Sequence, residues 1–283
     1  MRIVVTGASG MLGREVLAAA PANGHETVGL AHADLDIADA RAVDAALVEL
    51  RPDAVVNCAA FTDVDGAEQD EPAAMLINDQ GAGLLAAAAN RAGATIVHPS
   101  SDYVFDGSAG RPYVESDMPS ALSAYGRSKQ AGETSVAVSN PRHFIVRSSW
   151  LFGLGGKNFV ETMLRIGAEQ PEVLVVTDQV GSPTYTRHLG EALVMLAETE
   201  DFGIHHIAGA GQCSWYEFAQ EIFDQAGVEC KVMAATTDML ARPAPRPPFS
   251  ALGTERTAPI VLPHWRKGLA EYLAERQLAG ATA

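Results

Sequence analysis

The pair Tyr125 and Lys129 carries the first chemical signal in this sequence of 283 residues. Residues four positions apart on a helix lie on the same face, one turn from each other. A phenol has an ordinary pKa of about 10, and a neighbouring ammonium lowers that pKa by favouring the phenolate. The pair therefore suits proton transfer to or from a substrate oxygen. The alternative is an exposed aromatic ring beside a solvated Lys on a surface helix.

A glycine-rich turn near the start of the sequence carries the second signal. The short β-branched run at residues 3–5 predicts a buried parallel strand, and residues 14–20 predict a helix. Between them stand Gly7, Gly10 and Gly13. Glycines at this spacing let the backbone turn sharply and approach a pyrophosphate at the helix N-terminus. The alternative is a tight turn that binds no ligand.

A hydroxyl group at the end of a strand completes the set. Residues 95–102 predict a strand that ends in Ser100, Ser101 and Asp102. Ligands of open α/β sheets bind beyond the carboxyl ends of the strands, so Ser101 lies where chemistry is expected. The combination indicates ketone–alcohol redox chemistry with a nicotinamide, which carries the hydride. Ser101 would hydrogen-bond the carbonyl oxygen and Tyr125 would protonate the developing alkoxide, while Lys129 would lower the pKa of Tyr125 and bind the nicotinamide ribose.

The elements around these residues alternate between strands and helices. Strands are expected at 26–30, 53–60 and 144–147, and helices at 39–50, 77–92 and from Tyr125. This alternation predicts an α/β fold, a Rossmann-type doubly wound parallel sheet, over residues 1–149. Residues 150–283 are expected to form mainly a smaller C-terminal substrate domain. The apolar segment near 171–177 is expected to return to the main sheet.

The composition narrows the possible partners. The formal net charge is −15, which argues against a nucleic-acid partner. An anionic ligand must then be met by local donors, for which Lys157, Arg187, Arg242 and Arg246 are candidates. The three cysteines show no CxxC spacing, and no apolar stretch reaches membrane-spanning length. We therefore expect a cytoplasmic protein with reduced thiols, without a membrane partner and without a metal site.

Six strings of the sequence carry a resemblance to a known family: 57–62 (NCAAFT), 100–107 (SSDYVFDG), 125–129 (YGRSK), 147–150 (RSSW), 178–184 (DQVGSPT) and 246–250 (RPPFS). With these strings the sequence resembles the dTDP-4-dehydrorhamnose reductase family of the extended short-chain dehydrogenase/reductase superfamily. The resemblance spans nearly the whole chain. The family usually has Thr where this sequence has Ser101, and the hydroxyl group is retained.

The resemblance implies positions for both ligands. The residues that would line the cofactor are Gly7, Gly10, Met11, Leu12, Gly13, Asp36, Ile37, Cys58, Ala59, Ala60, Tyr125 and Lys129. Those that would contact a dTDP-sugar are Ser101, Asp102, Tyr103, Trp150 and Arg246. The cofactor is expected to be NADPH or NADH. The sequence lacks both a clear acid after the second strand and an Arg near His32, so the choice stays open.

The expected reaction is reduction of the 4-keto group of dTDP-4-dehydro-6-deoxy-L-mannose to dTDP-L-rhamnose. A nucleotide-sugar dehydratase would need an Asp-Glu pair after the hydroxyl residue, whereas Ser101 is followed by Asp102 and Tyr103. Two alternatives remain open. One is a 4-ketoreductase for another nucleotide deoxysugar, and the other is a non-catalytic subunit similar to the regulatory β subunit of methionine adenosyltransferase. A homodimer is one option for the assembly.

Overall fold

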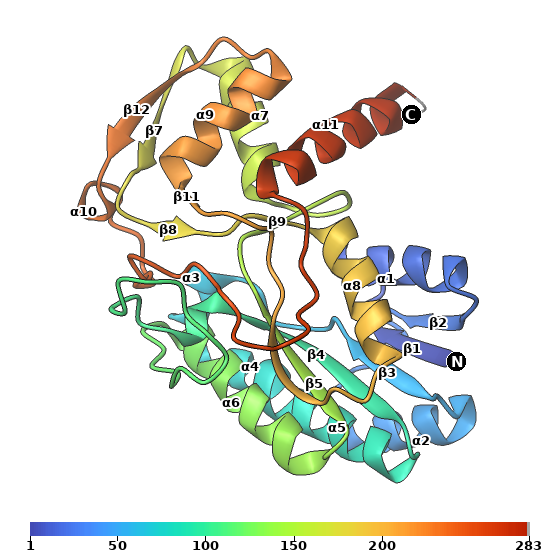
Figure 1. The fold of residues 1–283 in the computed structure, drawn as a ribbon. Coiled ribbons are helices and arrows are strands. Elements are labelled where there is room, and N and C mark those ends of the chain that lie inside the picture. Colours follow the sequence, from blue (N-terminus) through green and yellow to red (C-terminus); the bar gives the residue numbers. More distant parts are fainter. Residues whose placement is uncertain (282–283) are drawn as a thin grey trace.

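A six-stranded parallel sheet forms the centre of the molecule in the computed structural model, which describes residues 1–281 (Figure 1). The strand order is β10-β5-β4-β3-β1-β2. The strands are β1 (Arg2–Thr6), β2 (Glu26–Leu30), β3 (Ala54–Asn57), β4 (Thr95–Ser101), β5 (His143–Ser148) and β10 (Gly203–His206). β2 pairs with one side of β1 and β3 with the other, both in parallel, so the order of strands changes direction between β1 and β3 and places a topological switch point there. The predicted α/β, Rossmann-type doubly wound fold is confirmed.

Successive residues of a strand point to opposite faces of the sheet, and the strands here are apolar on both. Helices therefore cover both faces of this sheet. Ile3 and Val5 pack under α1 (Met11–Ala22) and α8 (Thr186–Ala197). Val4 faces the other core, under α2 (Ala40–Leu50), α5 (Ala82–Arg91) and α6 (Ala124–Ser139). The side chains of all three residues are fully buried. Short segments complete this part: α3 (Val64–Ala67), α4 (Glu71–Met75), the π-helix η1 (Leu76–Gly81) and the 3-10 helix η2 (Asp102–Val104).

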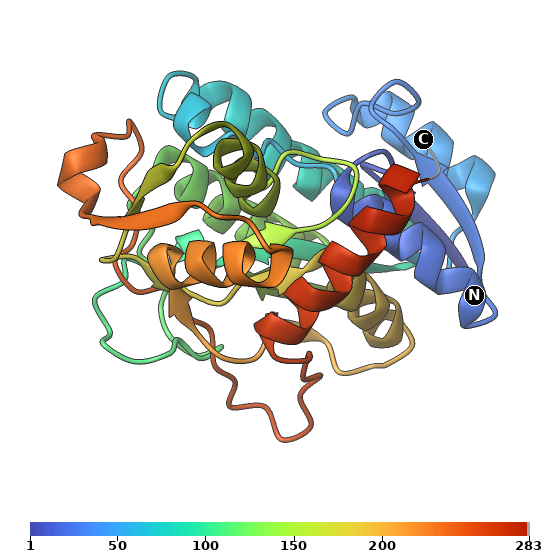
Figure 2. The same cartoon turned by 90° about the horizontal axis from the view of Figure 1, so that it is seen from above.

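Most of the chain after β5 forms a second layer beyond the carboxyl ends of the strands (Figures 1 and 2). Its helices are α7 (Phe159–Glu169), α9 (Trp215–Ala226), α10 (Thr237–Leu240) and α11 (Trp265–Ala281). Three two-stranded sheets join β6 (Leu151–Phe152) to β9 (Thr184–Tyr185), β8 (Val180–Gly181) to β11 (Cys213–Ser214), and β7 (Glu172–Val176) to β12 (Lys231–Ala235). Phe152, Phe218, Trp265 and Tyr272 form a separate core within this layer.

The expectation that the segment near 171–177 returns to the main sheet is wrong. β7 pairs with β12 at the far end of the second layer, and Leu174 on it is 51% exposed. The strand that returns is β10, which pairs with β5 after α8 has packed against α1. The apolar run of β7 is thus only partly covered, with Val175 and Val176 buried but Leu174 exposed, whereas a central parallel strand is buried on both faces.

The cysteines and the helices are relevant to the predicted cytoplasmic location. Cys58, Cys213 and Cys230 are free thiols, as predicted. Within residues 1–281, helices that are long and apolar enough to cross a membrane are absent. The cytoplasmic location stays a prediction.

Candidate active site

Ser101 ends β4 and lies opposite Ser148 of β5 in the register of the parallel sheet. Its side chain is buried, and its Oγ accepts a hydrogen bond from the backbone N–H of Tyr103 at 3.1 Å. The Oγ also donates to Oδ1 of Asp102 at 3.2 Å. The hydroxyl group is therefore held at the carboxyl edge of the sheet, where the sequence placed it.

Helix α6 brings Tyr125 to Ser101. Ser123 caps the helix by accepting a hydrogen bond from the backbone N–H of Gly126 at 3.1 Å. A Cβ atom at Gly126 would lie 2.2 Å from the carbonyl oxygen of Tyr103, so glycine is required for this close approach of α6 to η2. The rings of Tyr103 and Tyr125 meet edge to face with centroids 6.1 Å apart.

Burial determines the protonation of Tyr125. It raises the pKa of the phenol to about 12, although a hydrogen bond with Ser101 lowers it. This direction is opposite to the lowering by Lys129 that the sequence led us to expect. Tyr125 is consequently a protonated donor at neutral pH, in hydrogen-bonding contact with the Ser101 hydroxyl.

Lys129 lies one helical turn beyond Tyr125 and is 3% exposed. Its Nζ donates to the carbonyl oxygen of Pro99 on β4 at 2.9 Å. Burial lowers the pKa of the Lys129 ammonium to about 8, while the nearby Glu133 and Cys58 raise it. Cys58 follows β3, so Lys129 lies between α6 and the segment after β3 that is expected to line the cofactor.

The glycine turn has the form that a dinucleotide pyrophosphate requires. Gly7 has a φ of +64°, and a Cβ atom there would lie 2.5 Å from the backbone of Cys58. A Cβ atom at Gly13 would lie 2.3 Å from the carbonyl oxygen of Gly7. Helix α1 then begins with Gly10 as its N-cap, and the described chain supplies no side-chain hydrogen bond to that cap. Its first amide groups are thus available to an anion. These features fit NADPH or NADH.

The other residues that are expected to bind the cofactor lie around the switch point between β1 and β3. Their side chains differ in exposure. Cys58, Ala59 and Ala60 are half-buried at the end of β3, and burial raises the pKa of the Cys58 thiol to about 12. Met11 opens α1 and contacts the segment 153–158, since its Sδ lies 3.8 Å from Nδ2 of Asn158. The remaining residues divide into the buried Leu12 and Ile37 and the exposed Asp36, whose Oδ1 accepts a hydrogen bond from Ala38.

Asp102 is buried beside the Ser101 hydroxyl and has a partner that the sequence did not indicate. Ser250 donates a hydrogen bond to Oδ2 of Asp102 at 2.5 Å, from the proline-rich segment at 242–250. Burial raises the pKa of Asp102 to about 7, and the hydrogen bonds from Ser250 and Ser101 oppose that shift. The segment 242–250 is therefore tied directly to the carboxyl edge of the sheet beside Ser101.

Trp150 stands two residues beyond Ser148 and is half-buried. Its φ of +48° lies in the left-handed region, which is rare for a bulky residue. The indole stacks on that of Trp215, the first residue of α9, with centroids 3.5 Å apart and ring planes 6° apart. Sequence reasoning missed Trp215, because 65 residues separate the two positions.

Arg246 is only 10% exposed, and Asp65 of α3 accepts two hydrogen bonds from its guanidinium, at 3.0 and 2.9 Å. Asp65 also accepts the backbone N–H of Ala244 and lies 3.8 Å from Arg242. Both Arg side chains act electrostatically on Tyr103, so they lie near the expected substrate residues. The positive charge of Arg246 is thus oriented by a carboxylate in this structure.

Comparison with known proteins identifies the family. The family model described as "RmlD substrate binding domain" matches residues 1–278. The chain belongs to this family. The dTDP-4-dehydrorhamnose reductase of Streptomyces griseus is 43% identical over 280 residues, covering 95% of this chain and 92% of the relative. A probable dTDP-4,6-dihydroxy-2-methyloxan-3-one 4-ketoreductase of Streptomyces antibioticus is 42% identical over 279 residues, covering 96% of this chain and 94% of the relative.

A solved structure supports the same assignment to the RmlD family. The dTDP-4-dehydrorhamnose reductase of Bacillus anthracis, in complex with NADP, is 37% identical and has a TM-score of 0.94. The match covers 97% of this chain and 99% of that chain. The sequence-based resemblance to the dTDP-4-dehydrorhamnose reductases is therefore confirmed.

A buried ion pair joins α6 to the carboxyl edge of the sheet in this RmlD family member. Arg147 of β5 donates to both carboxylate oxygens of Glu133 on α6, at 2.9 and 2.8 Å, and both side chains are buried. Ser100 donates to the same carboxylate at 2.6 Å. Glu133 lies one turn beyond Lys129, so the pair fixes α6 against β4 and β5. Arg147 lies in the string at 147–150 that resembles the family, but its pairing with Glu133 could not be predicted from the sequence.

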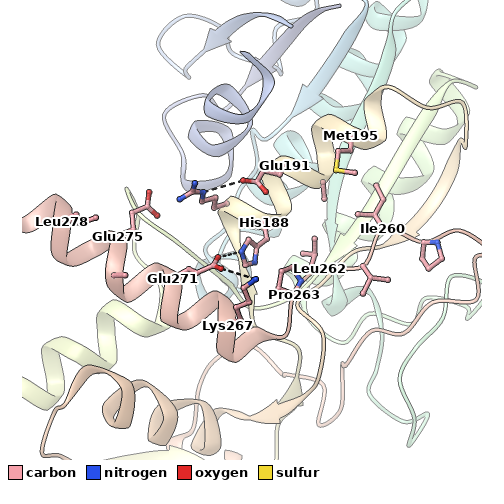
Figure 3. Close-up of a pocket in the computed structure, with 15 residues that line it drawn as sticks. His188, Glu191, Met195, Ile260, Leu262, Pro263, Lys267, Glu271, Glu275 and Leu278 are labelled. Atoms are coloured by element: carbon pink, nitrogen blue, oxygen red, sulfur yellow. Dashed lines mark hydrogen bonds and ion pairs between the residues drawn. The ribbon is translucent and has the colours of Figure 1, made fainter. Parts of the chain in front are cut away.

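A cavity of about 1020 Å³ lies elsewhere, between α8, α11 and residues 259–263 (Figure 3). Its walls include His188 and Glu271, whose Nε2 and Oε2 atoms are hydrogen-bonded at 2.5 Å, and the exposed apolar side chain of Met195. Arg187 also lines it, 3.6 Å from Glu191. Arg187 was a candidate donor for the substrate pyrophosphate, but its charge is engaged here. The cavity walls contain none of the described residues expected to act in catalysis.

Proposed function

We propose that this protein reduces the 4-keto group of dTDP-4-dehydro-6-deoxy-L-mannose with NADPH or NADH and releases dTDP-L-rhamnose. One observation carries the proposal: the protonated Tyr125 is in hydrogen-bonding contact with Ser101 at the carboxyl edge of the sheet, beside the buried Lys129. This grouping lies next to a glycine turn that suits a dinucleotide. The likeness to dTDP-4-dehydrorhamnose reductases over nearly the whole chain supports the substrate.

The chain's own residues would supply the proton and the electrostatic support. The bound nicotinamide would deliver a hydride to the ketone carbon. Tyr125 would give its proton to the developing alkoxide, because burial keeps the phenol protonated. Ser101 would hydrogen-bond the same oxygen. Lys129, an ammonium at neutral pH, would offset the negative charge left on Tyr125 and hold the nicotinamide ribose.

The second layer would hold the nucleotide sugar. Residues 150–283 mainly serve this role in the proposal, apart from α8 and β10, which belong to the central sheet layer. Trp150 and Tyr103 would contact the sugar. Arg246, with its guanidinium held by Asp65, is the basic residue proposed for the diphosphate. We also propose a cytoplasmic location and a homodimer, without nucleic-acid or membrane partners.

A second candidate is reduction of another dTDP-deoxysugar at C4. The relative from Streptomyces antibioticus favours it, because its 42% identity nearly equals the 43% identity of the reductase from Streptomyces griseus. A regulatory, non-catalytic role is less well supported, since Ser101, Tyr125 and Lys129 are all present and brought together.

Incubation with the ketosugar nucleotide and NADPH or NADH tests the proposal. Oxidation of the cofactor, followed by NMR assignment of the C4 configuration, distinguishes dTDP-L-rhamnose from its C4 epimer. Tyr125→Phe should lower kcat by about 10²–10⁴-fold with cofactor affinity unchanged. Tyr216→Phe on α9 is the matched control and should retain kcat, because the half-buried Tyr216 ring packs against the core of the second layer and its hydroxyl accepts a hydrogen bond from Gln220. A kcat of Tyr125→Phe near that of the control would remove Tyr125 from the mechanism.

A further inference from the structure

The stacked pair Trp150 and Trp215 joins the catalytic edge to the second layer. Trp150 follows β5, and its backbone is fixed by a hydrogen bond from the N–H of Thr184 to its carbonyl oxygen at 3.2 Å. Trp215 opens α9, a helix of 12 residues whose N-terminus is closed by the capping box of Ser214 and Glu217. The ring of Trp215 therefore extends from a rigid element, whereas Trp150 lies in a connection between two strands.

Three features restrict the orientation of the Trp150 ring. Its left-handed backbone conformation is unfavourable for a bulky side chain and needs support from its surroundings. Trp215 provides an almost parallel ring at 3.5 Å. Gly181 of β8 provides space, since a Cβ atom there would lie 2.4 Å from Cε2 of Trp150. Any larger residue at 181 would have to displace the indole.

Trp215 is in turn supported from its other neighbours. The ring centroids of Trp215 and Phe159, the first residue of α7, lie 4.4 Å apart, and the two ring planes form an angle of 51°. Phe159 follows Asn158, which caps α7 and donates to the carbonyl oxygen of Gly153 at 2.9 Å. Both indoles remain half-buried, so this aromatic row keeps some surface open to a ligand.

We propose that Trp215 is a positioning residue, which holds Trp150 in its left-handed conformation so that the indole can receive the sugar ring of the substrate. This inference rests on the proposed function for the identity of the substrate, but the stack itself does not. The role predicts an effect on binding of the sugar nucleotide rather than on hydride transfer. It also predicts that Gly181 and Trp215 act on the same group from different elements.

The stack can be measured without any substrate, because the chain has only three Trp residues. Near-UV circular dichroism of the protein should contain a coupled-indole signal that disappears in Trp215→Phe and in Trp150→Phe. Trp265→Phe is the matched control: Trp265 is buried in the same core but meets Phe218 edge to face, with centroids 5.5 Å apart, and its loss should leave the indole–indole signal in place. A coupled-indole signal that persists in Trp215→Phe would refute the stacking of Trp150 on Trp215.

Kinetics then test the role. Trp215→Ala and Gly181→Ala should each raise KM for the sugar nucleotide by roughly 2- to 12-fold, the range for an aromatic pair, with kcat and the KM for the cofactor changed less. Trp215→Phe should recover part of the loss, because it keeps an aromatic face, and it serves as the folded variant if Trp215→Ala does not fold. Turnover with an unchanged KM in both Trp215→Phe and Gly181→Ala would overturn the role of Trp215 alone. Absence of turnover in the wild type would overturn the proposed function, and with it the assignment to the sugar.

Discussion

Replacement of Glu133 by Gln should be among the most destabilising conservative changes in this protein. Arg147 is 1% exposed and Glu133 is 7% exposed, so neither charge is solvated. The Gln side chain keeps the shape of Glu but leaves the guanidinium buried without a counter-charge. Removing one partner of such a buried pair costs about 3–5 kcal/mol of unfolding free energy. Ser100 would also lose its charged acceptor.

The same helix offers a matched control. Arg127 of α6 forms an equally short two-bond pair with Glu71, at 2.8 and 2.7 Å, but its side chain is 42% exposed and that of Glu71 is 36% exposed. Water therefore solvates and screens both charges, and Glu71→Gln should cost about 0–1 kcal/mol. The type and geometry of the two ion pairs are the same, so the contrast between the variants reports mainly on burial, with the hydrogen bond from Ser100 to Glu133 as the remaining difference.

Urea unfolding followed by far-UV circular dichroism measures both free energies. We expect the Glu133→Gln midpoint to fall far below that of Glu71→Gln, with similar slopes m. The double variant Glu133→Gln with Arg147→Met should be more stable than Glu133→Gln alone, because the buried charge is then removed. A loss in Glu133→Gln no larger than in Glu71→Gln would refute the reasoning.

Three further predictions concern pH, a helix cap and the cofactor. Burial raises the pKa of Asp102 from 3.8 to about 7, so the folded state binds this proton more tightly than the unfolded state does. The contribution of Asp102 to the free energy of unfolding therefore falls as pH rises between these values. Asp102→Asn should lose this part of the pH dependence when urea unfolding is compared at pH 5 and pH 8, and an unchanged pH dependence would count against the shift. Ser214→Ala removes the N-cap of α9 and should cost about 1 kcal/mol in the same assay, whereas Ser214→Thr should cost less. Asp34 and Asp36 are exposed in the loop that follows β2 and would repel a 2′-phosphate, so NADH should be used at least as well as NADPH. A hundredfold higher kcat/KM with NADPH would show that this interpretation is wrong.

The sequence sufficed for those parts of the molecule that are fixed by local spacing. The glycine turn and the pair Tyr125 and Lys129 lie within seven and five residues of chain, and one strand-to-helix turn or one helical turn determines their geometry. The sheet followed from alternating strands and helices. The net pKa of Tyr125 could not be predicted, because it depends on the degree of burial by segments that are distant in sequence.

The parts that sequence reasoning missed depend on contacts between distant segments. Ser250 reaches Asp102 across 148 positions. The strand β10 contains His205 and His206 and lacks a long apolar run, yet it joins the main sheet because α8 carries the chain back across the face covered by α1. β7 has the apolar run of a central strand but pairs at the periphery. In both strands, tertiary packing overrides the local pattern.

One face of α6 sets the geometry of the proposed chemistry. Tyr125, Lys129 and Glu133 follow each other at intervals of four residues, so they lie along a single stripe of the helix. The stripe meets Ser101, the carbonyl oxygen of Pro99 and Arg147 on the adjacent strands β4 and β5. Any shift of α6 along the sheet would break all three contacts together, and two of them involve charged groups that burial would leave unpaired. The ion pair at the distal end of the stripe therefore holds Tyr125 and Lys129, the residues proposed for catalysis, in register. Of the residues proposed to meet the sugar nucleotide, Trp150 and Arg246 lie outside this stripe and after β5 in the chain, so substrate preference can change at these two positions without disturbing the register.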